Sequence, residues 1–206
     1  MYLVKTPAFI KKIYPDLIWD LNRNEKTAYL TFDDGPVPES TPWVLDVLKE
    51  YKLKATFFCI GQNVIKNPDI YQRLLDEGHR VGNHTQTHVA GWTTKNGDYL
   101  KEIETAAQSI SSHLFRPPYG RITRSQAKAL KKDYKIIMWD VISGDFDQSI
   151  TAEACYKNVV NNVRNGSIIV FHDSAKAKER LHGSLERVLD NLLEQEYKFI
   201  LIPNTF

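Results

Sequence analysis

Short apolar runs alternate along the chain with longer segments in which apolar residues recur at helical spacing. Seven runs have the length and composition of strands, the third and fourth being weak: Ala28–Phe32, Ala55–Ile60, Arg80–Gly82, His113–Phe115, Lys135–Trp139, Ser167–Phe171 and Lys198–Ile202. Six segments are helical: Thr41–Tyr51, Asp69–Glu77, Tyr99–Ser112, Thr123–Lys132, Thr151–Asn165 and Leu181–Glu196. This alternation predicts βα units in a parallel α/β sheet, and periodicity alone leaves an open sheet and a closed barrel as alternatives.

Length and composition indicate one globular domain. The chain has 206 residues, and no linker or internal repeat divides it. Residues 1–26, which are irregular and aromatic, predict an N-terminal strap across a domain formed by residues 27–206. Cys59 and Cys155 are expected to be reduced, buried thiols, and a disulfide between them is the alternative.

Charge gives no sign of a nucleic-acid or membrane partner. The formal net charge is +2, and no apolar run approaches the roughly 18–20 residues of a transmembrane helix. We expect a monomer without a nucleic-acid partner. Residues 1–12 lack the apolar core of a signal peptide, so none is expected in this chain, and the compartment stays open.

Ionisable residues follow five of the strand-like runs. Asp33 and Asp34 follow the first run, His84 and His88 follow the third, and Arg116 follows the fourth. Asp140 and Asp145 follow the fifth run, and His172 and Asp173 follow the sixth. Because the carboxyl ends of parallel strands form the ligand-binding edge of such folds, these groups predict one functional site.

Three local patterns carry chemistry, each with a simpler alternative. His84 and His88, placed four apart on a helical turn, suit a divalent metal, but they are also compatible with two surface histidines. Asp33 and Asp34 allow one carboxylate to bind a metal and the other to act as a base, whereas Asp34 alone also suits a turn or helix cap. Arg116-Pro-Pro-Tyr-Gly120 offers a guanidinium and a free Tyr119 N–H, or simply a rigid turn.

Four motifs in this order resemble the polysaccharide deacetylase family, the NodB-homology domain of carbohydrate esterase family 4. They are Thr31-Phe-Asp-Asp-Gly-Pro36, His84-Thr-Gln-Thr-His88, Arg116-Pro-Pro-Tyr-Gly120 and Val170-Phe-His-Asp173. The resemblance covers residues 27 to 202. It implies a single-domain, distorted (β/α)7-type barrel and a zinc-dependent hydrolase that removes N-acetyl groups from an amino-sugar glycan of the chitooligosaccharide or peptidoglycan type, releasing acetate.

The resemblance also implies a role for each matching residue. Asp34, His84 and His88 would bind one divalent metal, most simply Zn²⁺, with Co²⁺ or Ni²⁺ as alternatives. Asp33 would be the catalytic base, held by Arg116, and the Tyr119 N–H would stabilise the oxyanion. His172 would be the general acid, tuned by Asp145, although Asp140 competes for that assignment.

Two positions depart from the family pattern, and both belong to the acetyl pocket that the resemblance implies. Phe146 replaces a common Trp and Val170 a common Leu, so we expect a reshaped apolar pocket. Pro117 and Trp139 are assigned to substrate binding with them. Trp92, in a Gly- and Thr-rich loop, is assigned either to the core or to a sugar-binding face.

Other polar residues have plainer interpretations, and other functions remain open. His79 and His113 are expected at the surface or in turns, and Lys176–Arg180 in a solvated segment. The alternatives are a metal-dependent hydrolase of a small amide or formyl group, a hydrolase of an O-acetylated glycan, a non-catalytic carbohydrate-binding relative, and a metal-free sugar-binding barrel.

Overall fold

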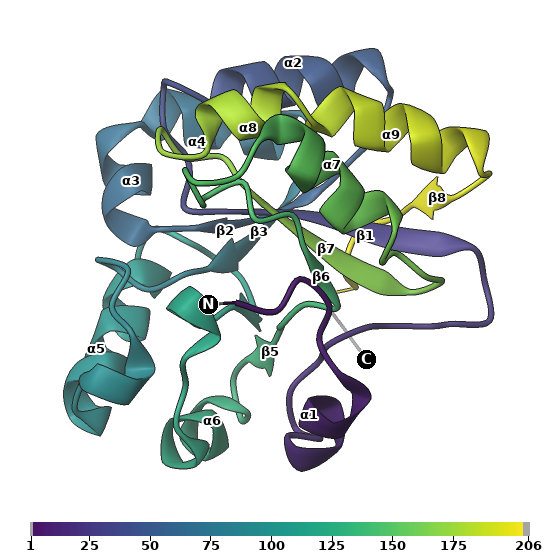
Figure 1. The fold of residues 1–206 in the computed structure, drawn as a ribbon. Helices are drawn as coiled ribbons and strands as arrows, with labels where there is room; N and C mark the ends of the chain where they lie inside the picture. The colour runs from purple at the N-terminus through teal and green to yellow at the C-terminus, as the bar shows by residue number, and fades with distance from the viewer. Residues whose placement is uncertain (1, 204–206) are drawn as a thin grey trace.

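A computed structural model describes residues 2–203. Its strands are β1 (Thr27–Asp33), β2 (Thr56–Cys59), β3 (Arg80–Asn83), β4 (Leu114–Phe115), β5 (Lys135–Ile136), β6 (Val141–Ile142), β7 (Ser167–His172) and β8 (Lys198–Phe199). All pairings between these strands are parallel, in the order β5-β4-β3-β2-β1-β7-β6, and β8 pairs with the start of β1. The sheet curls into a half-barrel, which confirms the predicted single-domain α/β barrel class (Figure 1).

Helices surround this curled sheet. They are α1 (Ala8–Ile13), α2 (Thr41–Glu50), α3 (Gly61–Lys66), α4 (Pro68–Asp76), α5 (Asn96–Ala107), α6 (Arg124–Leu130), α7 (Ala152–Val160), α8 (Lys178–His182) and α9 (Leu185–Glu194), with 3₁₀ turns at Gly91–Thr93 and Pro118–Gly120. In Figure 1, α2, α7, α8 and α9 lie above the sheet and α1, α5 and α6 below it. No helix of residues 2–203 is long and apolar enough to cross a membrane.

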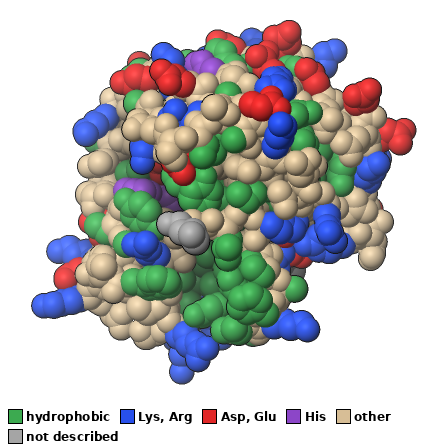
Figure 2. All heavy atoms as spheres, viewed as in Figure 1, with side chains coloured by type: hydrophobic (Ala, Val, Ile, Leu, Met, Phe, Trp, Pro, Cys, Tyr) green, Lys and Arg blue, Asp and Glu red, His purple; other side chains and the backbone are tan. Residues whose placement is uncertain are grey.

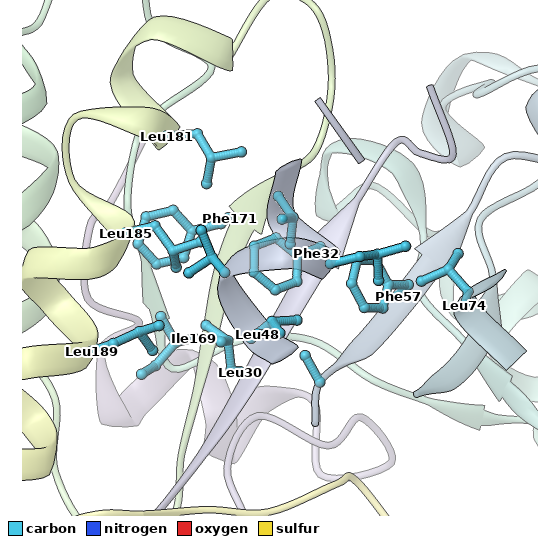
Figure 3. Close-up of a cluster of buried hydrophobic side chains, with 14 of the residues drawn as sticks. Leu30, Phe32, Leu48, Phe57, Leu74, Ile169, Phe171, Leu181, Leu185 and Leu189 are labelled. Carbon is cyan, nitrogen blue, oxygen red and sulfur yellow. The ribbon is translucent and has the colours of Figure 1, made fainter. Parts of the chain in front are cut away.

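Side chains of β1 alternate between two environments, and this alternation positions the site. Leu30 and Phe32 point outward and pack with Leu48 of α2 and Leu185 of α9 in the main core (Figure 3). Thr31 and Asp33 carry the opposite parity, and both contact one guanidinium on the inner side of the curled sheet. A strand buried along its whole length thus delivers a carboxylate to the barrel interior.

The strap fills the gap between the two edges of the curled sheet. Ile18 exchanges backbone hydrogen bonds with the β5 edge, since its N–H donates to Ile136 and its carbonyl accepts from Met138. At the β6 edge, the Ile142 N–H donates to Val4 at 2.9 Å. Sheet edges that would otherwise stay unpaired are therefore covered by the chain itself.

Several local expectations are confirmed and several are wrong. Cys59 and Cys155 are buried and free, as expected, and Thr123 and Thr151 cap the predicted helices α6 and α7. β6, α1 and α3 were not predicted from the sequence, and the helix expected over Leu181–Glu196 is broken into α8 and α9.

Candidate metal centre and catalytic site

Asp34, His84 and His88 come together at the carboxyl end of the sheet. One ligand atom from each lies within 4.8 Å of the others. The Oδ1 atom of Asp34 is 3.2 Å from Nε2 of His88 and 3.7 Å from Nε2 of His84. This oxygen is buried and has no hydrogen-bond partner in the part of the chain that is described, which is costly unless a cation occupies the space between the three groups. The two-histidine, one-carboxylate set therefore fits a divalent metal.

Neighbouring groups set the tautomer and the charge of His84 that metal binding requires. The Nδ1 atom of His84 lies 2.7 Å from the carbonyl of Arg116, so the ring donates there and leaves Nε2 as a lone-pair donor. Burial lowers the pKa of His84 to about 4, which keeps the ring neutral at neutral pH. A neutral imidazole is the form that binds metals.

The two histidines reach the site from an irregular loop, and the predicted helical turn is wrong. Thr85 and His88 have positive φ angles of 67° and 61°. Asn83 accepts a hydrogen bond from the Thr85 N–H, and the Gly61 N–H at the start of α3 donates to the Thr85 carbonyl. The conformation of this loop, and not a helical turn, orients both imidazole rings toward Asp34.

Backbone strain gathers at this site. Six residues other than glycine have positive φ among residues 2–203, and four of them, Asp34, Thr85, His88 and Tyr119, surround the candidate metal position. Such conformations cost about 1–3 kcal/mol each and persist where surrounding contacts hold them, as they do at many functional sites.

Arg116 holds Asp33 in a fully buried ion pair. Its Nη1 donates to Oδ1 of Asp33 at 2.6 Å and to Oγ1 of Thr31 at 2.7 Å. Carbonyls of Ile137 and Met138 accept the remaining guanidinium hydrogen bonds, and the Phe58 ring lies 4.0 Å away. These partners offset the desolvation of a buried charge and fix one oxygen of Asp33.

Asp145 is the carboxylate that contacts His172, and Asp140 is not. Asp145 accepts hydrogen bonds from the backbone N–H of His172 at 2.7 Å and from its Nδ1 at 2.8 Å. Burial disfavours the charged ring, but the charge and hydrogen bond of Asp145 outweigh burial and raise the pKa of His172 to about 9. His172 is therefore a protonated group at neutral pH, placed beside Asp33 by the β1–β7 register.

The Tyr119 backbone is free to meet a ligand. The Gly120 and Arg121 N–H groups donate to the carbonyls of Pro117 and Pro118, whereas the Tyr119 N–H has no hydrogen-bond acceptor among residues 2–203. The Tyr119 ring packs on His88 at 4.6 Å between centroids. This arrangement places the donor next to the metal ligands.

A cavity of about 840 Å³ contains these groups. Asp33, Asp34, His84, His88, Tyr119 and His172 line it, and so do Phe146, Trp139 and Trp92. Pro117 and Val170 are buried and do not line it, so the cavity gives no support to their assignment to substrate binding. Its mixture of apolar walls and converging polar groups is typical of a substrate site.

Two polar residues were misjudged from the sequence. His79 is buried, and its Nδ1 accepts a hydrogen bond from the Ala55 N–H at 3.2 Å, so it is a core residue and not a surface one. Arg180 is 7% exposed and donates to the carbonyl of Asp145 at 2.6 Å. Its neighbours Lys178 and Glu179 are exposed, so the short charged run hid one buried guanidinium.

Fold and site together define a class of protein, a curled βα barrel with a candidate metal position flanked by a buried carboxylate and a protonated imidazole. The sequence profile of the polysaccharide deacetylase family matches residues 20–135. The chain is 34% identical over 191 residues to a peptidoglycan-N-acetylglucosamine deacetylase of Bacillus cereus, covering 89% of this chain and 90% of that protein. It belongs to the polysaccharide deacetylase family.

Solved structures agree with this membership. The crystal structure of a peptidoglycan N-acetylglucosamine deacetylase in complex with 4-naphthalen-1-yl-N-oxidanyl-benzamide superimposes with a TM-score of 0.89 at 30% identity, covering 98% of this chain and 97% of that one. A carbohydrate esterase family 4 pseudoenzyme from Bacillus anthracis has a TM-score of 0.76 at 26% identity, covering 88% of this chain and 66% of that one. The fold therefore also occurs without activity, and catalysis depends on which residues occupy the site.

Proposed function

We propose that the protein is a zinc-dependent deacetylase that hydrolyses the N-acetyl group of N-acetylglucosamine residues in a peptidoglycan-type glycan. The observation that carries the proposal is the convergence of Asp34, His84 and His88 within 4.8 Å of one another, between two buried pairs that hold a base and an acid. Membership of the deacetylase family and the similarity to the B. cereus protein support the substrate class.

The chain's own residues divide the reaction among them. A divalent cation bound by Asp34, His84 and His88 would polarise the acetyl carbonyl and acidify a water molecule. Asp33, fixed by Arg116, takes the proton from the attacking water. The Tyr119 N–H donates to the oxyanion that develops on the acetyl carbonyl oxygen as water attacks the carbonyl carbon, and His172 gives its proton to the departing nitrogen.

Size favours a polymer over a small amide. The cavity of about 840 Å³ is far larger than a formyl or cyclic amide group requires, and it is lined by residues from widely separated parts of the chain. Chitooligosaccharides and O-acetylated glycans are the competing substrates.

An acetate-release assay tests the proposal. The purified protein is incubated with a peptidoglycan disaccharide-peptide, chitotetraose or acetylated xylan, each with Zn²⁺, with Co²⁺ or with a chelator. We expect metal-dependent acetate release, fastest from the peptidoglycan fragment. Asp33→Asn should reduce the rate by about 10²–10⁴-fold while zinc remains bound.

The same assay can contradict each part separately. Undiminished acetate release in the presence of chelator would contradict the metal dependence. Near-normal turnover by Asp33→Asn would contradict the assignment of Asp33 as the base. Absence of release from every N-acetylated glycan would favour a carbohydrate-binding role.

A further inference from the structure

Part of the strap forms one wall of the substrate cavity. Tyr2, Leu3, Thr6, Pro7 and Ile10 line it together with the metal ligands. Leu3 is 55% exposed although it is a large apolar side chain. In Figure 2, hydrophobic side chains gather on the lower half of this face, where α1 and α6 lie in Figure 1.

The strap also reaches the catalytic acid through a chain of aromatic rings. The ring centroid of Tyr2 lies 4.9 Å from that of Phe146, and Phe146 lies 5.1 Å from the ring of His172. Tyr2 is thus one ring further from the acid than Phe146.

One buried carboxylate anchors the strap. Asp140, whose side chain is fully buried, accepts a hydrogen bond from Lys5 at 2.6 Å and another from Lys11, and it lies 3.3 Å from Nη2 of Arg23. Three cations from the strap thus meet one acceptor in the loop between β5 and β6. Burial alone would raise the pKa of Asp140, but these hydrogen bonds and that of Ser167 lower it to about 2, so Asp140 is ionised at neutral pH.

We propose that the strap is a substrate-binding wall, on which the sugar next to the reacting N-acetylglucosamine packs its apolar face, and that Asp140 holds this wall in place. Pyranose rings present C–H faces that pack well on apolar and aromatic side chains, and Trp92, 63% exposed, faces the same cavity from another segment. The inference rests on the proposed function and adds that Leu3 and Tyr2 determine how strongly the enzyme prefers longer glycans.

Leu3 and Phe9 provide a matched pair of variants. Both are exposed apolar residues of the strap, at 55% and 61%, but only Leu3 lines the cavity. The measured quantity is the ratio of kcat/KM for chitotetraose to that for chitobiose. We expect Leu3→Ala to lower this ratio about five-fold, because part of a Leu contact is lost, and Phe9→Ala to leave it unchanged.

Asp140→Asn should lower the same ratio, because it releases Lys5 and Lys11 from the carboxylate. This second test uses variant protein that circular dichroism shows to be folded. Binding of chitotetraose to the inactive Asp33→Asn protein, with and without Leu3→Ala, gives a readout that needs no turnover. A Leu3→Ala variant with the wild-type ratio and wild-type affinity would overturn the inference while leaving the deacetylase proposal intact. Failure of the wild-type enzyme to release acetate from any N-acetylated glycan, the peptidoglycan fragment included, would count against the proposed function instead.

Discussion

Asp33 and Asp34 are adjacent in the sequence but face different partners. Asp33 ends β1 in extended backbone and meets the Arg116 guanidinium, whereas Asp34 has a φ of 82° and turns toward the two histidines. Burial alone would raise the pKa of Asp34, but the interactions with His88 and with the protonated His172 outweigh burial and lower it. Two like charges can therefore remain ionised side by side, because each has a separate cationic environment.

His172 leads to a prediction about pH. As the proposed general acid, His172 must be protonated, so activity should fall as pH rises through its pKa, which is about 9 and which a bound cation would lower. Asp145→Asn removes the charge that raises this pKa, and burial then dominates and lowers it. We expect the alkaline limb of the kcat/KM profile to move to lower pH, measured from pH 5 to 10. An unmoved limb would show that another group controls it.

The residues of the candidate site were easier to predict from the sequence than the residues that contact them in the folded protein. Short local motifs contain Asp33, Asp34, His84 and His172, so these residues can be recognised from the sequence alone. Arg180 is not, because its contact with the Asp145 carbonyl joins residues 35 positions apart and depends on the packing of α8.

The connection between β1 and α2 gives a prediction at the scale of an element. Gly35 donates its N–H to Asp173, and a Cβ atom at this position would lie 2.0 Å from Oδ2 of that buried carboxylate. Gly35→Ala should therefore displace the turn that carries Asp33 and Asp34. We expect a loss of about 1–3 kcal/mol in the free energy of unfolding and weaker zinc binding, measured by urea denaturation and metal titration.

Gly97→Ala is the control for that substitution. Gly97 lies in α5, and a Cβ atom there would meet nothing within 4 Å. Alanine should leave zinc binding unchanged and stabilise the helix by at most about 1 kcal/mol. Equal effects of the two substitutions would contradict the proposed clash with Asp173.

Long patterns were predicted best, although β4, β5 and β8, of two residues each, also lie within runs that the sequence analysis identified as strands. β1, β2 and β7 are continuous apolar runs in a parallel sheet, and helices with an apolar stripe, such as α2, emerged directly. β6 has two residues and α1 has six, too few for any periodicity. The His84–His88 spacing suggested a helix because the contacts of Asn83 and α3 that hold an irregular loop there are not local in sequence.

At the scale of the whole molecule, parallel pairing explains why one site contains groups from across the chain. The site groups follow the carboxyl ends of four strands: Asp33 and Asp34 at β1, His84 and His88 after β3, Arg116 after β4 and His172 at the end of β7. The strap then covers both edges of the sheet and contributes to the cavity. A metal bound at this junction would therefore connect distant segments and stabilise the fold as well as the reaction.

This connection predicts a rise in the melting temperature with zinc. A ligand that binds only the folded state at 100 times its Kd adds about 2.7 kcal/mol, which for a protein of this size corresponds to about 5–10 °C. Wild type and Asp33→Asn should both show the rise, because Asp33 is bonded to Arg116 and does not belong to the ligand set. Asp34→Ala and His84→Ala should abolish it, as scanning calorimetry with and without Zn²⁺ can measure. A rise that survives in Asp34→Ala would place the cation elsewhere, and its loss in Asp33→Asn would make Asp33 a ligand and leave the reaction without its base.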